Sequence, residues 1–357
     1  MIHMKTKQVK ILKIFFSVFY CLIGAEIFLR IIAPVPILPR RVCAASYGIR
    51  GNKPNQTYWQ RTPETTVKLK TNSKGIRADR EIPYEKPVGV YRIVLLGDSF
   101  GMGYEVDYND MFSTRLEWHL RESYQINAEV INLSTSGHGT AEELIVLQNE
   151  GLRYHPDIVL VQWHSTDYQD NIRSDLYGLK DGALYVKNET YLPAVKIRET
   201  LEKLFFYVWV EENSQFYTFF REFAAVKAKA LLDSLRSTRV RPNTVNQNNN
   251  ESKEDYSTQL SVALLDKIKA VCSDRKIEFM ILDIPRPRGS KEFYSVFPFE
   301  PDQLNGRYYL YSPIDDFKKA NGQKIFWEKG HGHLTPLGCD IVGKGLAEYV
   351  VKNALLK

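Results

Sequence analysis

Four continuous apolar runs, separated by segments with helical patterns, constrain the possible folds of this sequence more than any other feature. The runs are "YRIVLLG" (91–97), "AEVINLS" (128–134), "DIVLVQW" (157–163) and "IEFMILDI" (277–284). They lack the polar-apolar alternation of a half-exposed strand, so we expect each strand to be buried on both faces. Buried strands that alternate with helices are typical of a parallel sheet with helices on both sides. The sequence therefore predicts an α/β fold, a three-layer α/β/α sandwich built around a parallel sheet.

The helices between these strands carry recognisable start signals. Apolar residues spaced four apart predict a helix from about Asp110. Thr140 and Glu143 form a T-x-x-E capping box, which is typical of a helix N-terminus. Thr335 followed by Pro336 is a good N-cap and first-turn pair for a last helix. These signals extend the strand-helix alternation from the first apolar run to the end of the chain.

The N-terminal segment has the composition of a membrane anchor. A basic stretch, "MIHMKTKQVK", precedes the apolar run "ILKIFFSVFYCLIGAEIFLRII". The uncharged centre of this run, Ile14 to Ala25, is short for a spanning helix, which needs about 20 mainly apolar residues. Lys13 and Arg30 can extend towards the two interfaces, whereas Glu26 fits this interpretation least well.

Positive charge before the apolar run predicts the orientation of this anchor. Residues 1–34 are expected to cross the cell membrane once, with the N-terminus inside and the rest of the chain extracytoplasmic. A cleaved signal peptide is one alternative, although "VCAAS" (42–46) lies too far beyond the apolar run for a good cleavage site. A soluble amphipathic helix is the other alternative.

Two further segments interrupt the regular pattern. Residues 35–90 contain six prolines and few apolar runs, and we expect an irregular or β-rich arm before the main domain at 91–357. An insertion at 175–256 contains the aromatic-rich helical segment "LEKLFFYVWVEENSQFYTFFREF". This segment is expected to pack against the core or cover the site, with contact to a membrane surface or a partner as the alternative. The Asn-rich tract at about 243–255 has low complexity and is predicted to be a disordered loop.

Composition argues against several classes of protein. Lys and Arg outnumber Asp and Glu by 48 to 42, and much of the excess lies before residue 42. The remainder is close to neutral and has no Gly-rich phosphate loop, which argues against a nucleic-acid partner. The four cysteines have no CxxC spacing, which argues against a zinc ribbon. We expect no cofactor, and the sequence leaves the disulfide state and the oligomeric state open.

The carboxyl ends of the predicted strands carry most of the reactive side chains. "GDSFGMG" follows the first strand, "STSGHGT" the second and "HSTDYQDN" the third, and "GHGHLTPLG" precedes the last helix. In a parallel sheet, ligands bind in the crevice beyond these strand ends. A serine nucleophile needs a nearby histidine to take its proton, and the developing oxyanion needs preorganised N–H donors. Ser99, Gly137 and a histidine from 331–333 would supply those groups from three separate loops.

These motifs resemble the SGNH (GDSL-type) hydrolase family, and in particular its membrane-anchored bacterial members. Gly97, Asp98 and Ser99 match the first block of the family. Gly137 matches the glycine of the second block, and His333 in "HLTPLG" matches the histidine of the last. The resemblance implies the SGNH hydrolase fold, with a flavodoxin-like order of the parallel strands, and hydrolysis of an ester bond by a serine.

The resemblance also implies a role for each matched residue. Ser99 would be the nucleophile, and its backbone N–H would be one donor to the oxyanion. Gly137 would supply a second N–H donor, and His333 would be the general base. Gly97 and Asp98 would have structural roles in the turn that presents the serine.

The match covers most of residues 70–175 and 325–350, and its third block departs from the family pattern. This block, Gly-Asn-Asp in the family, aligns here on "TDYQDN". Thr166 then takes the place of an asparagine that donates to the oxyanion, and Asp167 matches as a structural residue. A hydroxyl can still donate one hydrogen bond, but loss of such a donor costs about 3 kcal/mol in comparable sites.

The second departure concerns the acid that supports the histidine. Family members often place an aspartate two residues before it, and here that residue is His331. A neutral imidazole cannot stabilise an imidazolium as a carboxylate does. Glu328, Asp315 or Asp316 could act instead, or a backbone carbonyl could leave a Ser-His dyad. A shifted register with Glu328 and His331 as the acid-base pair is also possible, although "HLTPLG" favours His333.

Histidine-rich loops are also compatible with a metal site. His138, His164, His331 and His333 could all lie near one crevice, and zinc sites use such ligands. Histidines on turns are common without a metal, so we expect none here. His138 is expected to line the pocket and His164 to lie at the rim of the core.

The sequence therefore predicts an extracytoplasmic serine acyl-ester hydrolase or O-acyltransferase that acts through Ser99 and His333. By resemblance, the substrate would be a small-molecule or glycan ester, such as O-acylated cell-envelope or exported polysaccharide. The alternative is a catalytically degenerate domain that binds a glycan or a partner in an envelope assembly. Thr166 and His331 support that alternative because they replace two expected helpers of the serine.

Overall fold

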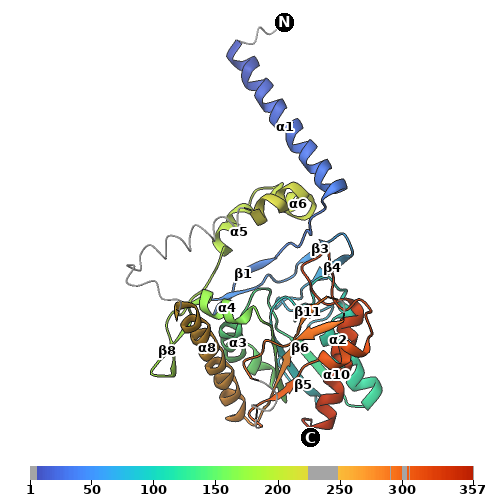
Figure 1. Cartoon of the computed structure of the whole chain (residues 1–357), viewed down its shortest axis with the longest axis vertical. Coiled ribbons are helices and arrows are strands. Elements are labelled where there is room, and N and C mark those ends of the chain that lie inside the picture. Colours follow the sequence, from blue (N-terminus) through green and yellow to red (C-terminus); the bar gives the residue numbers. More distant parts are fainter. Residues whose placement is uncertain (1–5, 224–247, 290, 300–303, 305, 357) are drawn as a thin grey trace.

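An α/β body carries one long helix that projects from it (Figure 1). The computed structural model describes residues 6–223, 248–289, 291–299, 304 and 306–356. The projecting helix is α1 (Thr6–Ile32), and the chain returns from it into the body through the segment that leads to β1 (Val42–Ala44).

The body is built around a five-stranded sheet in which every pairing is parallel. From one edge to the other the strands are β6 (Ala128–Asn132), β5 (Tyr91–Leu96), β7 (Ile158–Trp163), β10 (Glu278–Asp283) and β13 (Tyr309–Tyr311). Numbered along the chain, this order is 2-1-3-4-5, the flavodoxin-like arrangement. The predicted fold class is confirmed, and all four predicted strands are present. The fifth strand, β13, escapes prediction because its three residues are too few to form an apolar run.

Helices cover both faces of this sheet. They are α2 (Phe112–Tyr124) and α10 (Pro336–Lys352) on one face, and α3 (Thr140–Asn149), α4 (Asp167–Ser174) and α8 (Asn248–Ser273) on the other. Strand β5 shows the division, because Ile93 and Leu95 pack in the first hydrophobic cluster, under α2 and α10. Val94 and Leu96 point the other way and pack in the second cluster, with residues of α3 and α8. The three layers predicted from the buried strands are therefore present.

The arm before the sheet contains two antiparallel hairpins. They pair β1 with β2 (Arg50–Asn52) and β3 (Thr57–Arg61) with β4 (Thr66–Lys70). Tyr58 and Leu69 of the second hairpin share a buried cluster with Met102 and Tyr104, which follow Ser99 in the chain. The arm therefore packs directly on the loop that carries the serine. The division of the chain into anchor, arm and main domain stays a prediction.

The remaining elements are short and lie mostly around the strand ends and in the predicted insertion. They are η1 (Tyr108–Asp110), η2 (Gly151–Tyr154), β8 (Tyr177–Lys180), β9 (Ala183–Val186), α5 (Val195–Leu201), α6 (Tyr207–Asn213), β11 (Arg286–Arg288), β12 (Glu292–Tyr294) and α9 (Ile314–Lys319). Residues 215–223 are also helical. Of the Asn-rich tract, residues 243–247 lie outside the described residues, and 248–255 form the first turns of α8, where a loop was expected.

Glu26, the residue that fitted a membrane anchor least well, is a helix cap. Its carboxylate accepts hydrogen bonds from the Ser214 hydroxyl (2.8 Å) and from the backbone N–H groups of Gln215 (3.1 Å) and Phe216 (2.9 Å). Arg30, one turn further along α1, donates to the carbonyl of Asn213. By length and composition, α1 can cross a membrane, since Val9–Ile32 has a mean hydropathy of 2.0 and none of its most apolar window is buried. A signal sequence near an N-terminus passes the same test of length and composition.

Candidate active site

Ser99 follows the carboxyl end of β5, which lies between β6 and the central strand β7. The turn that carries it is fixed by Gln162 of β7, whose Oε1 accepts the backbone N–H groups of Asp98 (3.2 Å) and Gly101 (2.9 Å). A Cβ on Gly97 would lie 2.6 Å from the same Oε1 atom, so glycine is required for this close approach. The turn thus presents Ser99 at the edge of the sheet that the sequence predicted.

Asp98 is turned towards its own loop. Its Oδ1 accepts the Phe100 N–H at 2.8 Å, as in an Asx turn, and the side chain is buried. Burial raises the pKa of Asp98 to about 6, and the Phe100 hydrogen bond opposes that increase. These contacts agree with a structural role in the turn.

His333 bridges Ser99 and a carboxylate. Its Nε2 lies 2.8 Å from the Ser99 Oγ, and its Nδ1 lies 2.6 Å from Oε2 of Glu105. The loop that holds the histidine is fixed on both sides: Trp327 donates its N–H to the His333 carbonyl (2.8 Å), and Thr335 caps α10 by accepting the N–H of Gly338 (3.2 Å). The result is a serine, an imidazole and a carboxylate in line, which is the geometry of a hydrolytic triad.

Glu105 was not among the residues predicted for the site, although it follows Ser99 by only six positions. Its backbone adopts a left-handed conformation with φ of 65°, and its side chain is fully buried. Gln60 of β3 accepts the Glu105 N–H at 3.0 Å, and the indole N–H of Trp327 donates to the Glu105 carbonyl at 3.1 Å. The arm and the histidine loop therefore hold the acid from two sides.

Glu105 takes the position for which the sequence suggested other residues. His331 donates its backbone N–H to the Glu105 carboxylate (3.2 and 3.3 Å), while its ring stacks on His333 with centroids 6.3 Å apart. Glu328 is exposed and makes no hydrogen bond to His333. Asp315 and Asp316 lie on α9, where they pair with Lys318 and Lys319. Neither a shifted register nor a dyad is needed, because His333 contacts both Ser99 and a carboxylate.

Gly330 gives the one sequence signal that could have pointed to Glu105. A Cβ at this position would overlap the Glu105 carboxylate. In "GHGHLTPLG" the first glycine therefore leaves room for an acid that comes from the serine loop itself, "GMGYEV". Sequence reasoning searched near the histidine, and so it missed a carboxylate near the serine.

The other two predicted oxyanion residues, Gly137 and Thr166, lie in the loops after β6 and β7, the strands on either side of β5. Gly137 has φ of 78°, and a Cβ there would lie 2.7 Å from Nη2 of Arg50, so both backbone conformation and space require glycine. Thr166 precedes α4, and its Oγ1 lies 3.1 Å from Nδ1 of His164. Burial lowers the pKa of His164 to about 4, so this ring is neutral at pH 7.

A cavity of about 170 Å³ opens over Ser99. Its lining residues come from the serine turn, the loop after β7, the histidine loop and the arm: Arg40, Asp98, Ser99, Phe100, Tyr104, His164, Thr166, His331 and His333. Gly137 is not among them but lies beside Arg40 and Arg50. Arg40, which the sequence did not identify as a site residue, is the arm's contribution to the cavity.

The other predicted residues near the site have structural contacts. Asp167 accepts the His164 N–H at 2.9 Å, and burial raises its pKa well above the usual range. His138 is buried, with Nε2 2.7 Å from the Arg50 carbonyl. It was predicted to line the cavity, and it does not. Asn171 joins α4 to α3 by accepting the Ala141 N–H at 2.9 Å. Among the described residues, no group of three or more His, Cys, Asp or Glu side chains is arranged to hold a metal ion.

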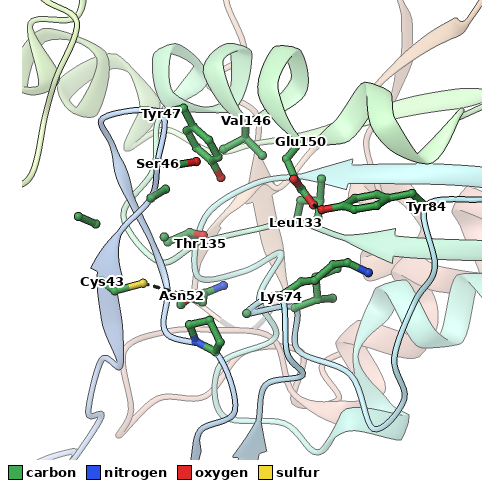
Figure 2. A pocket seen from close by; sticks show the side chains of 16 residues that line it. Cys43, Ser46, Tyr47, Asn52, Lys74, Tyr84, Leu133, Thr135, Val146 and Glu150 are labelled. Carbon is green, nitrogen blue, oxygen red and sulfur yellow. Dashed lines mark hydrogen bonds between the residues drawn. The ribbon is translucent and has the colours of Figure 1, made fainter.

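A larger cavity of about 270 Å³ lies between the first arm hairpin and the α3 side of the sheet (Figure 2). It is lined by residues such as Cys43, Ser46, Tyr47 and Tyr84, and the Tyr84 hydroxyl donates to Glu150 at 2.8 Å. None of the three aligned residues, Ser99, His333 or Glu105, is in its lining. Ser99 and His333 line the smaller cavity instead.

Comparisons with known proteins find similarity only at the level of structure. No protein-family model matches the sequence, and no curated protein matches it. Solved structures that are similar to this chain include a member of the lipolytic protein G-D-S-L family from Veillonella parvula (10% identity, TM-score 0.35, 73% of this chain and 97% of that chain). They also include the acetyl xylan esterase AlAXEase (11% identity, TM-score 0.38, 72% of this chain and 99% of that chain). A two-domain esterase active on acetylated mannans is similar as well (9% identity, TM-score 0.37, 74% of this chain and 49% of that chain). At these TM-scores, the activity of the chain has to be inferred from its own site geometry.

Proposed function

We propose that this chain is a serine ester hydrolase of the SGNH type, with Ser99 as the nucleophile, His333 as the general base and Glu105 as the acid that orients it. The observation that carries the proposal is the continuous path from the Ser99 Oγ to His333 Nε2 (2.8 Å) and from His333 Nδ1 to the Glu105 carboxylate (2.6 Å). A buried carboxylate at Nδ1 holds the proton there and leaves Nε2 free to accept the serine proton.

The proposed reaction proceeds in two halves through an acyl-enzyme. Ser99 Oγ attacks the ester carbonyl carbon while its proton passes to His333 Nε2. The imidazolium formed is stabilised by Glu105, and it then gives its proton to the leaving alcohol as the carbon-oxygen ester bond breaks. Water attacks the acyl-Ser99 ester in the same way, with His333 again as the base, and releases the carboxylic acid.

The oxyanion of each half-reaction needs donors that are in place before the substrate binds. The backbone N–H groups of Ser99 and Gly137 are the proposed donors, and Thr166 is a third candidate because its side chain lines the cavity. The Thr166 hydroxyl is shared with His164 Nδ1 at 3.1 Å, which limits its orientation.

The presence of Glu105 weakens the alternative of a degenerate binding domain. That alternative rested on Thr166 in place of an asparagine and on His331 in place of an acid, and the second ground is removed by a buried carboxylate 2.6 Å from His333 Nδ1. We therefore favour catalysis over glycan or partner binding alone. Transfer of the acyl group to a sugar hydroxyl would use the same residues, with the sugar in place of water.

We further propose that the enzyme is anchored by α1 with its site outside the cell membrane, acting on O-acylated polysaccharide of the cell envelope or on exported polysaccharide. Basic residues before α1 favour an inside N-terminus. Contacts of Glu26 and Arg30 with residues 213–216 support an anchor that is retained, because cleavage after α1 would remove them.

Labelling with a fluorophosphonate probe tests the proposed activity. The parent chain should be labelled, because the probe reacts with an activated serine, and Ser99→Ala should lose the label while remaining folded. Ser46→Ala is a matched control, since Ser46 lies in the larger cavity and should not affect labelling. An unlabelled parent, or a Ser99→Ala variant that is still labelled, would refute the proposed function.

A further inference from the structure

Two consecutive arginines at the start of the arm have different environments. Arg41 is buried and forms ion pairs with Glu211 (2.6 Å) and Glu212 (2.6 Å). Arg40 lines the cavity over Ser99, and among the described residues it has no hydrogen-bond or ion-pair partner. One arginine thus holds the arm in place, and the other is exposed and lines the same cavity as the proposed catalytic serine.

A second guanidinium lies beside the first. Arg50 donates through Nη2 to the Ser136 carbonyl at 2.6 Å. A Cβ on Gly137 would lie 2.7 Å from Arg50 Nη2 and 4.0 Å from Arg40 Nη1, so the two arginines approach the same glycine. Two guanidinium groups at one glycine repel each other, and burial together with the charge of Arg40 lowers the pKa of Arg50. This repulsion favours binding of an anion near Gly137.

Acidic groups near the cavity leave these charges largely unpaired. Asp98 directs its Oδ1 to the Phe100 N–H, and Glu105 is paired with His333. Glu142, an acid whose charge would act on Arg50, is buried, and burial raises its pKa to about 8. Its carboxyl is therefore mostly protonated at pH 7 and carries little charge. The cavity is left with excess positive charge on the side formed by the arm.

We infer that the ester substrate carries a negatively charged group, a carboxylate or a phosphate, close to the scissile ester, and that Arg40 binds this group. This inference rests on the proposed function, because it assigns a substrate class to the same site. A guanidinium presents N–H donors in a planar fork that matches carboxylate and phosphate oxygens. Arg40 is suited to this contact because no described protein group competes for it. Arg50, which lies beside the same glycine, adds a second positive charge.

Paired model esters test the inference with the full chain in detergent. The anionic 3- and 4-acetoxybenzoates are compared with their neutral methyl esters, and 4-acetoxyphenyl phosphate represents the phosphate class. We expect kcat/KM to be about 10- to 100-fold higher for an anionic ester than for its neutral partner, the range of a charge-assisted hydrogen bond. Arg40→Gln should remove most of this preference and Arg40→Lys should keep part of it, whereas Lys70→Gln, an exposed charge change on β4, should leave it intact.

The outcomes separate this inference from the proposed function. If the parent hydrolyses none of the esters, the proposed function fails. Equal hydrolysis of charged and neutral esters overturns the anionic substrate class alone. An equal loss for both types in Arg40→Gln also overturns it, because Arg40 would then act on the oxyanion common to all the esters. A preference for carboxylate over phosphate, or the reverse, supports the inference and identifies which anion the site accepts.

A different observation concerns the helices next to α1. Large apolar side chains in this region are solvent-exposed, with Phe205 at 95% and Trp209 at 66% relative exposure. We call them the aromatic face; its members are Leu204, Phe205, Phe206, Val208, Trp209, Phe219, Phe220 and Phe223. Figure 1 shows α5 and α6 at the end of the body from which α1 projects.

The aromatic face is fixed relative to α1 and to the body. Glu26 of α1 caps the helix of residues 215–223, and a cavity of about 530 Å³ beside it is lined by residues of α1, of α6 and of this helix, including Trp209 and Phe220. On the body side, Arg61 donates to the Glu212 carbonyl at 2.7 Å. Apolar side chains of α1, such as Phe19 and Ile23, therefore line one cavity together with members of the aromatic face, and Glu26 and Arg30 are the charged residues of that lining.

We propose that the aromatic face lies in the interface of the lipid bilayer that α1 crosses, so that α6 and the helix of residues 215–223 rest on the membrane beneath the catalytic body. This rests on the proposed anchor. Aromatic side chains are enriched at the level of lipid headgroups, where their apolar rings leave water. Continuity with α1 favours lipid over a protein partner as the occupant of this surface.

Tryptophan quenching by brominated lipid tests this placement with the full chain in phosphatidylcholine vesicles. The chain has five tryptophans, none of them in α1. Trp209→Phe should remove most of the bromolipid quenching, whereas Trp118→Phe should not, because Trp118 is also exposed (46%) but lies on α2. If quenching is the same in the parent and in Trp209→Phe, Trp209 is outside the bilayer and the proposal is overturned. A chain that does not associate with vesicles at all would refute the anchor, and the aromatic face proposal with it.

Discussion

His333→Ala should abolish ester turnover, while His331→Ala should lower it by no more than several-fold. The expected loss for His333→Ala is about 10⁴-fold or more in kcat, the scale seen when a triad member is removed. The reason is geometric: His333 Nε2 lies 2.8 Å from the Ser99 Oγ, whereas His331 contributes a backbone N–H to Glu105. Turnover of p-nitrophenyl acetate measures both effects.

This pair of variants also contains its own control. The two histidines are neighbours in one loop and their rings stack, so loss of folding would affect both variants in a similar way. Equal thermal unfolding of the two would leave chemistry as the cause of any difference. The reverse order of activities would refute the register in which His333 is the base.

Glu105→Gln should lower kcat by about 10⁴-fold, the effect of replacing a triad acid by its amide. Glutamine has the same shape, but it removes the negative charge that stabilises the imidazolium, and its amide N–H₂ can favour the wrong tautomer of His333. Glu105 is fully buried and lies 2.6 Å from Nδ1, so water cannot replace the carboxylate easily. The rate should be measured together with the fluorophosphonate labelling rate, since both depend on an activated serine.

Gly330→Ala and Glu328→Gln complete this test. The new methyl group of Gly330→Ala would overlap the Glu105 carboxylate and displace it, so activity should fall although every triad residue is unchanged. Glu328 is exposed and outside the path from Ser99 to Glu105, so Glu328→Gln should behave like the parent. A large loss in Glu328→Gln with an active Glu105→Gln would instead support the pairing of Glu328 with His331.

Much of the fold could be predicted because its signals are local. Strands β5, β6, β7 and β10 are continuous apolar runs, and each is buried on both faces as that pattern requires. Strand β13 has only three residues and forms an edge, so it leaves no comparable pattern in the sequence. The start of α10 followed from its cap, since the Thr335 hydroxyl accepts the Gly338 N–H. At α3 the predicted pair of Thr140 and Glu143 is wrong by one residue, because Gly139 is the N-cap and donates its N–H to Glu142.

The candidate site was only partly predictable, because only some of its residues lie next to a local signal in the sequence. Ser99 and His333 stand next to recognisable elements, a buried strand and a capped helix, so their meeting at one edge of a parallel sheet could be expected. Glu105 has no such marker, because its position depends on a left-handed backbone and on a hydrogen bond from its N–H to Gln60. Arg40 lies in an arm whose path over the sheet is not encoded by any periodic pattern.

The sequence by itself determined the parallel sheet, the loop that presents Ser99 and the histidine that could serve it, because burial and helix capping act over a few neighbouring residues. Only the tertiary structure decided which acid contacts His333, which arginine lines the cavity and which groups Glu26 of α1 binds. Each of those answers is a contact between segments far apart in the chain, such as Glu105 with His333 or Glu26 with Phe216. Such contacts depend on how loops and the arm pack against one another, and residue type and spacing do not specify that packing.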